Sequence, residues 1–159
     1  MTSKLWQGAA GLLLLFSLGC TGAEKESTPG PHGSHGGHTF RMPDGSELAL
    51  ELTIDDANRR IVVYAEAVGS NQPFAVDATQ LKAKFESDDL DFSTTLSSDP
   101  RKSDPKGESS RFAISLDELP QQLFTADEFR MTVWYPDADE THSVSMLHRN
   151  DHAHSYRHD

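Results

Sequence analysis

The stretch SELALELTI, from Ser46 to Ile54, decides the fold class of this 159-residue chain. Its leucine and isoleucine side chains recur at every second position, separated by Glu, Ala and Thr, which is the period of a β-strand with one buried face. Turn-forming residues follow at 55–58, and Arg60 to Val68 returns as a second strand rich in β-branched residues. The stretch therefore predicts a hairpin at the start of an antiparallel sheet.

The rest of the chain repeats this pattern of short alternating segments and turns. Further strands are expected at 74–76, 80–85, 90–96, 112–114, 129–135 and 141–148. A long polar surface loop is expected from Ser97 to Ser109. One short helix is expected from Asp117 to Leu123, with Asp117 as its N-cap and Pro120 at an early helical position. Seven or eight short antiparallel strands at this spacing predict an all-β, immunoglobulin-like sandwich.

Hydrophobic composition sets the limits of the expected domain. After Cys20, every Leu, Ile, Val and Phe residue lies between Phe40 and Leu147. Segments without such residues cannot bury enough apolar surface to fold by themselves. The expected parts are a flexible His- and Gly-rich tether, a β-sandwich domain and a flexible His-rich tail, at residues 20–39, 40–148 and 149–159 respectively.

The segment 1–19 has the features of an export signal. A lysine precedes an apolar run, Gly8 to Leu18, that is too short to cross a bilayer as a helix, so a transmembrane anchor is the weaker interpretation. The single cysteine, Cys20, follows directly and resembles the lipidated cysteine of the bacterial lipoprotein lipobox, although Ser17 stands where that pattern prefers leucine. Cleavage after Ala23 is the alternative. Both interpretations predict export to the periplasm or cell envelope, and the first predicts a lipid anchor in the membrane.

The formal net charge of the chain is −11. A surface this acidic repels nucleic acid and anionic membranes, and it raises the local concentration of cations. We therefore expect no nucleic-acid partner and regard cations as the natural ligands.

All eight histidines lie toward the two ends of the chain, outside its middle. Neutral imidazole is a good ligand for Zn(II), Cu(II) and Ni(II), and glycine lets a backbone fold closely around an ion. Zinc or copper is the expected ion. The candidate ligands are His32, His35, His38, His148, His152, His154 and His158. The alternative is that both His-rich segments are merely solvated, because ordering a flexible segment costs roughly 1–2 kcal/mol per residue.

Several segments together resemble small His-rich exported bacterial proteins of unknown function. The shared features are a Pro-His-Gly-Gly start, an acidic-apolar strand turning into a Val-Tyr strand, a Pro-Phe strand, a Ser-Ser-Arg-Phe segment and a histidine tail. They correspond to Pro31–His38, Leu50–Leu52, Ile61–Tyr64, Pro73–Val76, Ser109–Phe112 and His148–His158. In the first segment, Ser34 and His35 interrupt the family pattern. Related segments are associated with periplasmic adaptor proteins of cation-efflux systems, so the resemblance implies metal handling in the envelope.

The sequence contains no Gly-x-Ser-x-Gly, P-loop or His-Glu-x-x-His motif, so we expect a protein that is not an enzyme. The favoured hypothesis is an exported, lipid-anchored protein that captures or buffers divalent transition metals through its histidines, linked to an efflux system. Capture should weaken below about pH 6, as imidazoles become protonated. The alternative is an interaction module whose sandwich edge or Ser97–Ser109 loop binds an envelope protein, with the histidines only adding solubility.

Overall fold

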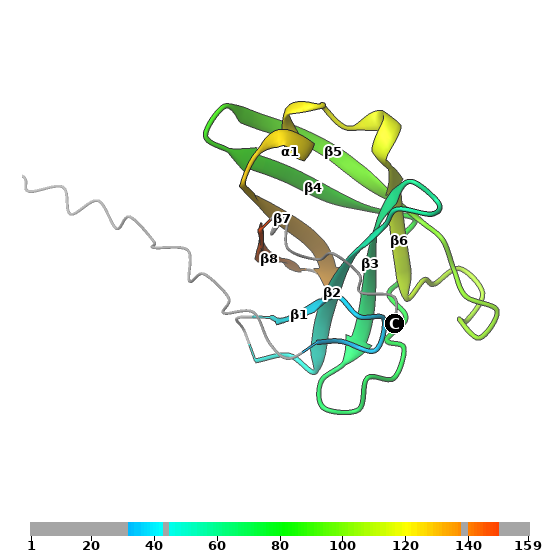
Figure 1. Ribbon diagram of the computed structural model, residues 1–159. Coiled ribbons are helices and arrows are strands. Elements are labelled where there is room, and N and C mark those ends of the chain that lie inside the picture. The colour runs from blue at the N-terminus through cyan, green and yellow to red at the C-terminus, as the bar shows by residue number, and fades with distance from the viewer. Residues whose placement is uncertain (1–31, 43–44, 138–139, 150–159) are drawn as a thin grey trace, which may run out of the picture.

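The computed structural model describes residues 32–42, 45–137 and 140–149, which form an antiparallel all-β fold with two short helical turns (Figure 1). The expected all-β, sandwich-like class is confirmed, and the described residues contain eight strands. These are β1 (His38–Arg41), β2 (Leu48–Asp55), β3 (Arg60–Ala67), β4 (Gln80–Ser87), β5 (Leu90–Ser98), β6 (Arg111–Ser115), β7 (Glu128–Asp137) and β8 (Glu140–Arg149). The helical turns are η1 (Leu116–Glu118) and α1 (Gln122–Thr125).

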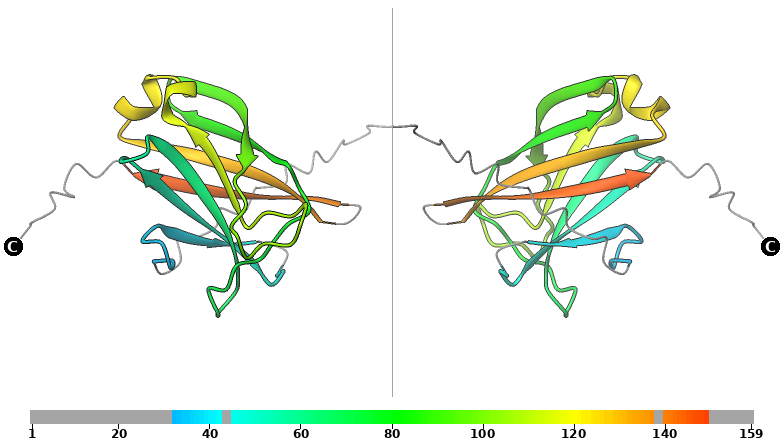
Figure 2. Two further views of the ribbon diagram at one scale, coloured as in Figure 1. Left: turned by 90° about the vertical axis from the view of Figure 1, so that its right-hand side faces the viewer. Right: turned by 90° about the vertical axis from the view of Figure 1, so that its left-hand side faces the viewer.

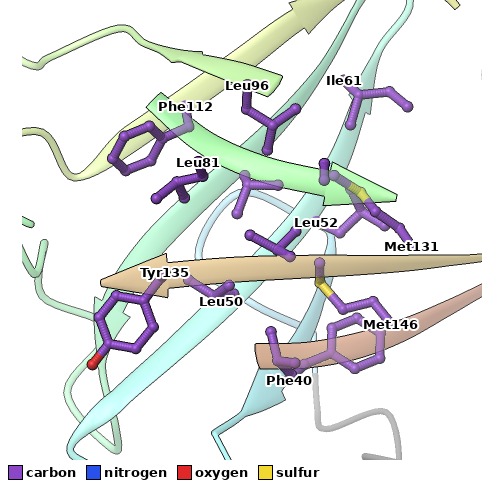
Figure 3. Close-up of a cluster of buried hydrophobic side chains, with 14 of the residues drawn as sticks. Phe40, Leu50, Leu52, Ile61, Leu81, Leu96, Phe112, Met131, Tyr135 and Met146 are labelled. Atoms are coloured by element: carbon purple, nitrogen blue, oxygen red, sulfur yellow. The ribbon is translucent and has the colours of Figure 1, made fainter. Parts of the chain in front are cut away.

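The strands of the described residues belong to one sheet, in the order β1-β2-β3-β6-β5-β4-β7-β8. The junction between β5 and β6 is short, because only Ser97–Ala113 and Ser98–Phe112 are paired there. Side chains from strands on both sides of this junction meet in one core (Figure 3), so the two halves of the sheet pack like the layers of a sandwich. The outermost strands, β1 and β8, come close to each other. The sheet therefore surrounds its core almost completely.

The core lies between the two halves of the sheet. Leu50, Leu52 and Ile61 from β2 and β3 point toward Met131 of β7 and Met146 of β8 (Figure 3). All five are buried, and burial of one such side chain contributes about 1.5–3 kcal/mol. The alternation of the quoted stretch is confirmed, since its leucines face inward.

The expected hairpin is confirmed as β2–β3, with its turn at 55–58. Its register pairs Glu51 with Tyr64, and Ala49 with Glu66. Because neighbouring side chains of a strand point to opposite faces, these four residues lie on the outer face of the sheet, away from the core. The outer face of this hairpin carries the candidate site.

The prediction of one continuous helix from Asp117 to Leu123, capped by Asp117, is wrong. Ser115 is the N-cap of η1, because its hydroxyl accepts a hydrogen bond of 3.2 Å from the Asp117 backbone N–H. Leu119 is extended, with φ −101° and ψ 146°, since a residue that precedes proline is disfavoured in the helical region. Helical backbone resumes only in α1. The two turns lie beside β4 and β5, at the end of the molecule opposite β1 (Figure 2).

The expected strand at 74–76 is present only as isolated bridges, which pair Glu66 with Pro73 and Val76 with Ser109. Proline has no backbone N–H to donate, so a regular ladder cannot continue through Pro73. This segment is therefore a connection that touches the sheet at two points.

The strand β1 begins at His38, two residues before Phe40, where the domain was expected to start. That residue lies inside β1, where it pairs with Leu50 and is fully buried. Residues 32–37, part of the predicted 20–39 tether, also pack on the sheet through hydrogen bonds to Glu51. These residues can pack on the sheet because glycine has no side chain to keep the backbone away from a strand. Their glycine-rich composition alone predicted a flexible linker.

The predicted signal at 1–19, the lipidation site Cys20 and the tail from residue 150 onward lie outside the described residues. Within the described ranges, no helix has both the length and the apolar character needed to traverse a membrane.

Candidate metal centre

A glycine-rich loop, residues 32–37, lies against the outer face of β2 and leads into β1. The Gly33 N–H donates a hydrogen bond of 2.9 Å to the Gly37 carbonyl and closes the loop. A Cβ added at Gly33 would lie 2.2 Å from Glu51 Cδ, and one at Gly37 would lie 2.1 Å from the Leu52 carbonyl oxygen. Only glycine at both positions permits this close approach of loop and strand.

Glu51 holds the loop in place from the middle of β2. Its side chain is 0% exposed. The carboxylate accepts hydrogen bonds from the Gly37 N–H at 2.7 Å and from the His35 N–H at 3.0 and 3.1 Å. The His35 Nδ1 lies 2.8 Å from Glu51 Oε2. Since hydrogen bonds to a charged group are worth about 1.5–3 kcal/mol each, Glu51 is the anchor of the loop and places a negative charge beside His35.

Glu66, on the neighbouring strand β3, is the second buried carboxylate. Its Oε1 accepts a hydrogen bond from the Ser34 hydroxyl and lies 3.3 Å from the His35 Nδ1. Its Oε2 is buried and has no hydrogen-bond partner among the described residues. A buried polar atom without a partner costs about 1–3 kcal/mol, and more when it is charged. This oxygen therefore marks a position that a ligand can complete.

The His35 ring is oriented by contacts on its face and at both of its nitrogens. Its plane lies on the Tyr64 ring, with 3.6 Å between centroids and 2° between planes. Its Nδ1 faces Glu51 and Glu66, while its Nε2 lies 3.1 Å from Nη2 of Arg101. A guanidinium can only donate hydrogen bonds, so Nε2 accepts. We therefore assign the proton of the neutral ring to Nδ1, where it faces the two carboxylates.

Arg101 belongs to the loop between β5 and β6, whose conformation is set by Asp104. The Asp104 carboxylate accepts hydrogen bonds from the Arg101 N–H at 2.8 Å, the Ser110 N–H at 2.9 Å and the Ser110 hydroxyl at 2.8 Å. Partial burial acts to raise the pKa of Asp104, but these hydrogen bonds outweigh it and lower the pKa below its usual value. The Arg101 guanidinium also lies 5.1 Å from the Tyr64 ring centroid. The expected polar loop at 97–109 thus supplies a cation to the site.

His35, Glu51 and Glu66 form a group that can hold a metal ion, because one donor atom of each lies within 4.8 Å of the others. Donor atoms bound to a single tetrahedral ion are about 3.3–3.6 Å apart when each bond is about 2.0–2.2 Å long. The distance from the His35 Nδ1 to Glu66, 3.3 Å, already has that spacing, whereas the 2.8 Å to Glu51 is a hydrogen-bond distance that would lengthen when an ion binds. An ion at this position would replace the Nδ1 proton.

Of the predicted metal ligands, the structure brings His35 to the buried carboxylates and places His32 and His38 elsewhere. His32 and His38 stack on each other, with 5.2 Å between ring centroids. His148, on β8, packs beside Phe129 with 4.9 Å between ring centroids. The remaining predicted residues lie outside the described part of the chain; they are His152, His154, His158 and the lipidation residue Cys20.

Glu51 and Glu66 are absent from the ligands predicted from the sequence. Both occupy polar positions of alternating strands, which ordinarily face water. The period of the strand does not reveal that a loop covers them. The available signal was the pair of glycines around His35, Gly33 and Gly37, because glycines that bracket a ligand indicate close packing of the backbone.

Comparisons with protein-family models, with curated proteins and with solved structures gave no significant match.

Proposed function

We propose that this protein binds a divalent transition-metal ion through His35, Glu51 and Glu66, and that it captures or buffers such ions at the cell envelope. The observation that carries the proposal is the buried Glu66 Oε2, which has no hydrogen-bond partner in the described part of the chain and lies beside an imidazole nitrogen and a second buried carboxylate. A cation would supply the missing partner and neutralise negative charge that is costly to bury.

The donor set favours Zn(II) or a similar divalent ion over Cu(I). One imidazole nitrogen and two carboxylate oxygens suit borderline divalent ions, whereas Cu(I) prefers thiolate and thioether sulfur. The thioethers of Met42, Met131 and Met146 are packed in the hydrophobic core. The donors offered at this site are therefore nitrogen and oxygen.

Export and lipid anchoring belong to the same proposal. They are supported by the apolar run at 8–18, by the position of Cys20 and by the resemblance to His-rich exported proteins. The net charge of −11 would concentrate cations near an anchored chain. The link to cation efflux rests on the resemblance, and the proposed role is binding rather than catalysis.

Calorimetric titration of Zn(II) tests the proposal. The reference protein is the full chain with His152, His154 and His158 replaced by asparagine, here called the tail-substituted chain, so that the tail imidazoles do not compete. We call His35, Glu51 and Glu66 together the buried group. In the tail-substituted chain, Glu66→Gln should weaken zinc binding at the buried group at least tenfold, since the amide keeps the volume of the side chain but loses its charge. The matched control is Glu118→Gln, which removes an exposed carboxylate on η1 and should leave binding unchanged. Equal zinc affinity in the two variants would refute the proposed site.

A further inference from the structure

Two exposed imidazoles face each other where the glycine-rich loop begins and ends. His32 and His38 form an isolated antiparallel bridge, and their rings stack with 5.2 Å between centroids and 29° between planes. We infer that this pair is a second metal site, which binds a borderline divalent ion such as Cu(II) or Zn(II) between the two imidazoles. It uses none of the side chains of the buried group.

The register brings these two side chains together. Within the bridge, the hydrogen bond runs between the adjacent residues, from the Gly33 N–H to the Gly37 carbonyl at 2.9 Å. His32 and His38 are therefore a non-hydrogen-bonded pair, the arrangement in which opposite side chains of antiparallel strands approach most closely. The closed loop that anchors His35 thus also holds this pair in register.

The observed ring separation is compatible with two imidazoles bound to one tetrahedral ion. Each metal–nitrogen bond is about 2.0–2.1 Å long and the ring centre lies about 1 Å beyond the nitrogen, so two imidazoles on a tetrahedral ion have centroids about 5 Å apart. The measured 5.2 Å agrees with this value. Rotation of exposed rings about their side-chain bonds is easy, and it can direct one nitrogen of each ring at a common ion without moving the backbone.

The pair is separate from the buried group. His38 is opposite Leu52 in the β1–β2 register and has the same strand parity as the buried Phe40. His35 instead contacts Glu51, which points to the opposite face of β2 from Leu52. The chain then offers one site with two nitrogen donors and another with one nitrogen and two carboxylates. The two-histidine site leaves coordination positions to water, which suits rapid exchange and uptake, whereas the buried group suits retention.

Titration of Cu(II) into the tail-substituted chain, followed by electron paramagnetic resonance, tests the inference because the nitrogen hyperfine pattern reports how many imidazoles bind the ion. We expect an ion with two bound nitrogens. The double variant His32→Asn/His38→Asn should lose that signal and bind this ion at least tenfold more weakly. Each single variant should lose nearly as much as the double variant, since one remaining imidazole cannot chelate. His142→Asn is the control that removes a histidine from another strand and should leave the signal intact.

The experiments test the two proposed metal sites independently of each other. Persistence of the two-nitrogen signal in the double variant, or its loss in the His142→Asn control, would overturn the inference. If Glu66→Gln leaves all metal binding unchanged while the double variant loses the two-nitrogen ion, the exposed pair stands and the buried group does not. If the double variant binds as the reference does while Glu66→Gln loses an ion, the exposed pair is refuted.

Discussion

The imidazole of His35 lies parallel to the ring of Tyr64, with 3.6 Å between their centroids and 2° between their planes. Tyr64 is paired with Glu51 on one side and with Arg111 on the other, so it is held within the middle of the sheet. Rotation of the His35 ring about its Cβ–Cγ bond would swing it out of this parallel arrangement, so the stack opposes that rotation. The stack therefore directs the nitrogen edge of His35 toward the carboxylates.

Tyr64→Leu should weaken zinc binding because it removes the stack while keeping an apolar side chain. Aromatic pairs of this kind are worth about 0.5–1.5 kcal/mol beyond their buried area, which corresponds to a loss of roughly two- to tenfold in affinity. Calorimetry on the tail-substituted chain measures it. Tyr64→Phe keeps the ring and should bind as the reference does; a Tyr64→Phe variant as weak as Tyr64→Leu would assign the effect to the hydroxyl instead.

In a tail-substituted chain that also carries His32→Asn and His38→Asn, Glu66→Gln should stabilise the metal-free protein while it abolishes stabilisation by zinc. Removing a buried charge whose Oε2 has no partner among the described residues should raise the free energy of unfolding by about 1–3 kcal/mol. Stabilisation by a ligand that binds only the folded state should then be absent at zinc concentrations that stabilise the same chain with Glu66. Denaturant unfolding with and without zinc checks both parts. A less stable apo variant would show that the carboxylate is already satisfied.

Gly37→Ala should disrupt the site, whereas Gly36→Ala should leave it intact. A Cβ at Gly37 would overlap the backbone of Leu52, whereas one at Gly36 meets no described residue within 4 Å and only strains a φ of +82°. Gly37→Ala should detach the loop and lose zinc binding. Gly36→Ala should cost about 1–2 kcal/mol of stability at most and retain binding. Hydrogen exchange at the His35 and Gly37 amides reports the loop, and protection that survives Gly37→Ala would contradict the packing argument.

Arg101→Gln should strengthen zinc binding. The guanidinium donates to His35 Nε2 at 3.1 Å and so keeps the proton on Nδ1, the nitrogen that an ion needs. When an ion takes Nδ1, the neutral ring carries its proton on Nε2, and the contact with Arg101 must break. In Arg101→Gln, the proton is no longer held on the Nδ1 that zinc needs, and a nearby positive charge is removed. The affinity for zinc should therefore rise about tenfold, or about 1.4 kcal/mol. Lys102→Gln removes an exposed charge from the same loop and serves as the control; equal gains in both would indicate only a change in net charge.

Asp104→Asn should make the protein less sensitive to acid. The pKa of Asp104 is lowered from its usual value of 3.8, so its ionised form stabilises the folded state above that pH. This stabilisation is lost as the pH falls through the lower folded-state pKa. The difference in unfolding free energy between wild type and variant should be constant from about pH 5 to 7 and shrink below about pH 4. Denaturant titrations across this range measure it, and a difference that grows as the pH falls would reverse the assigned sign.

The sequence predicted the sheet far better than the site. Period-two alternation identifies strands such as β2 because the inward leucines are forced into the core. The β1 strand escaped prediction because it is short and its burial shows mainly at Phe40. The break at Leu119 follows from the proline after it, a local rule that could have been applied to the predicted helix.

The site was harder to predict because it depends on long-range packing. His35 was recognised as a candidate ligand from its residue type and its neighbours. Glu51 and Glu66 became candidates only when the loop was seen to cover them, and Arg101 is joined to His35 across 66 positions of the chain. Such contacts depend on strand order and loop closure, which a single sequence does not specify.

The attachment of the glycine-rich loop to the outside of β2, rather than to the interior, makes this region a natural place for engineering. Donor residues in the loop can be exchanged combinatorially while Gly33, Gly37 and Glu51, which hold the loop against β2, are kept. The hydrophobic interior need not be redesigned. A library randomised at Ser34 and His35 would therefore sample new ion selectivities on an unaltered scaffold.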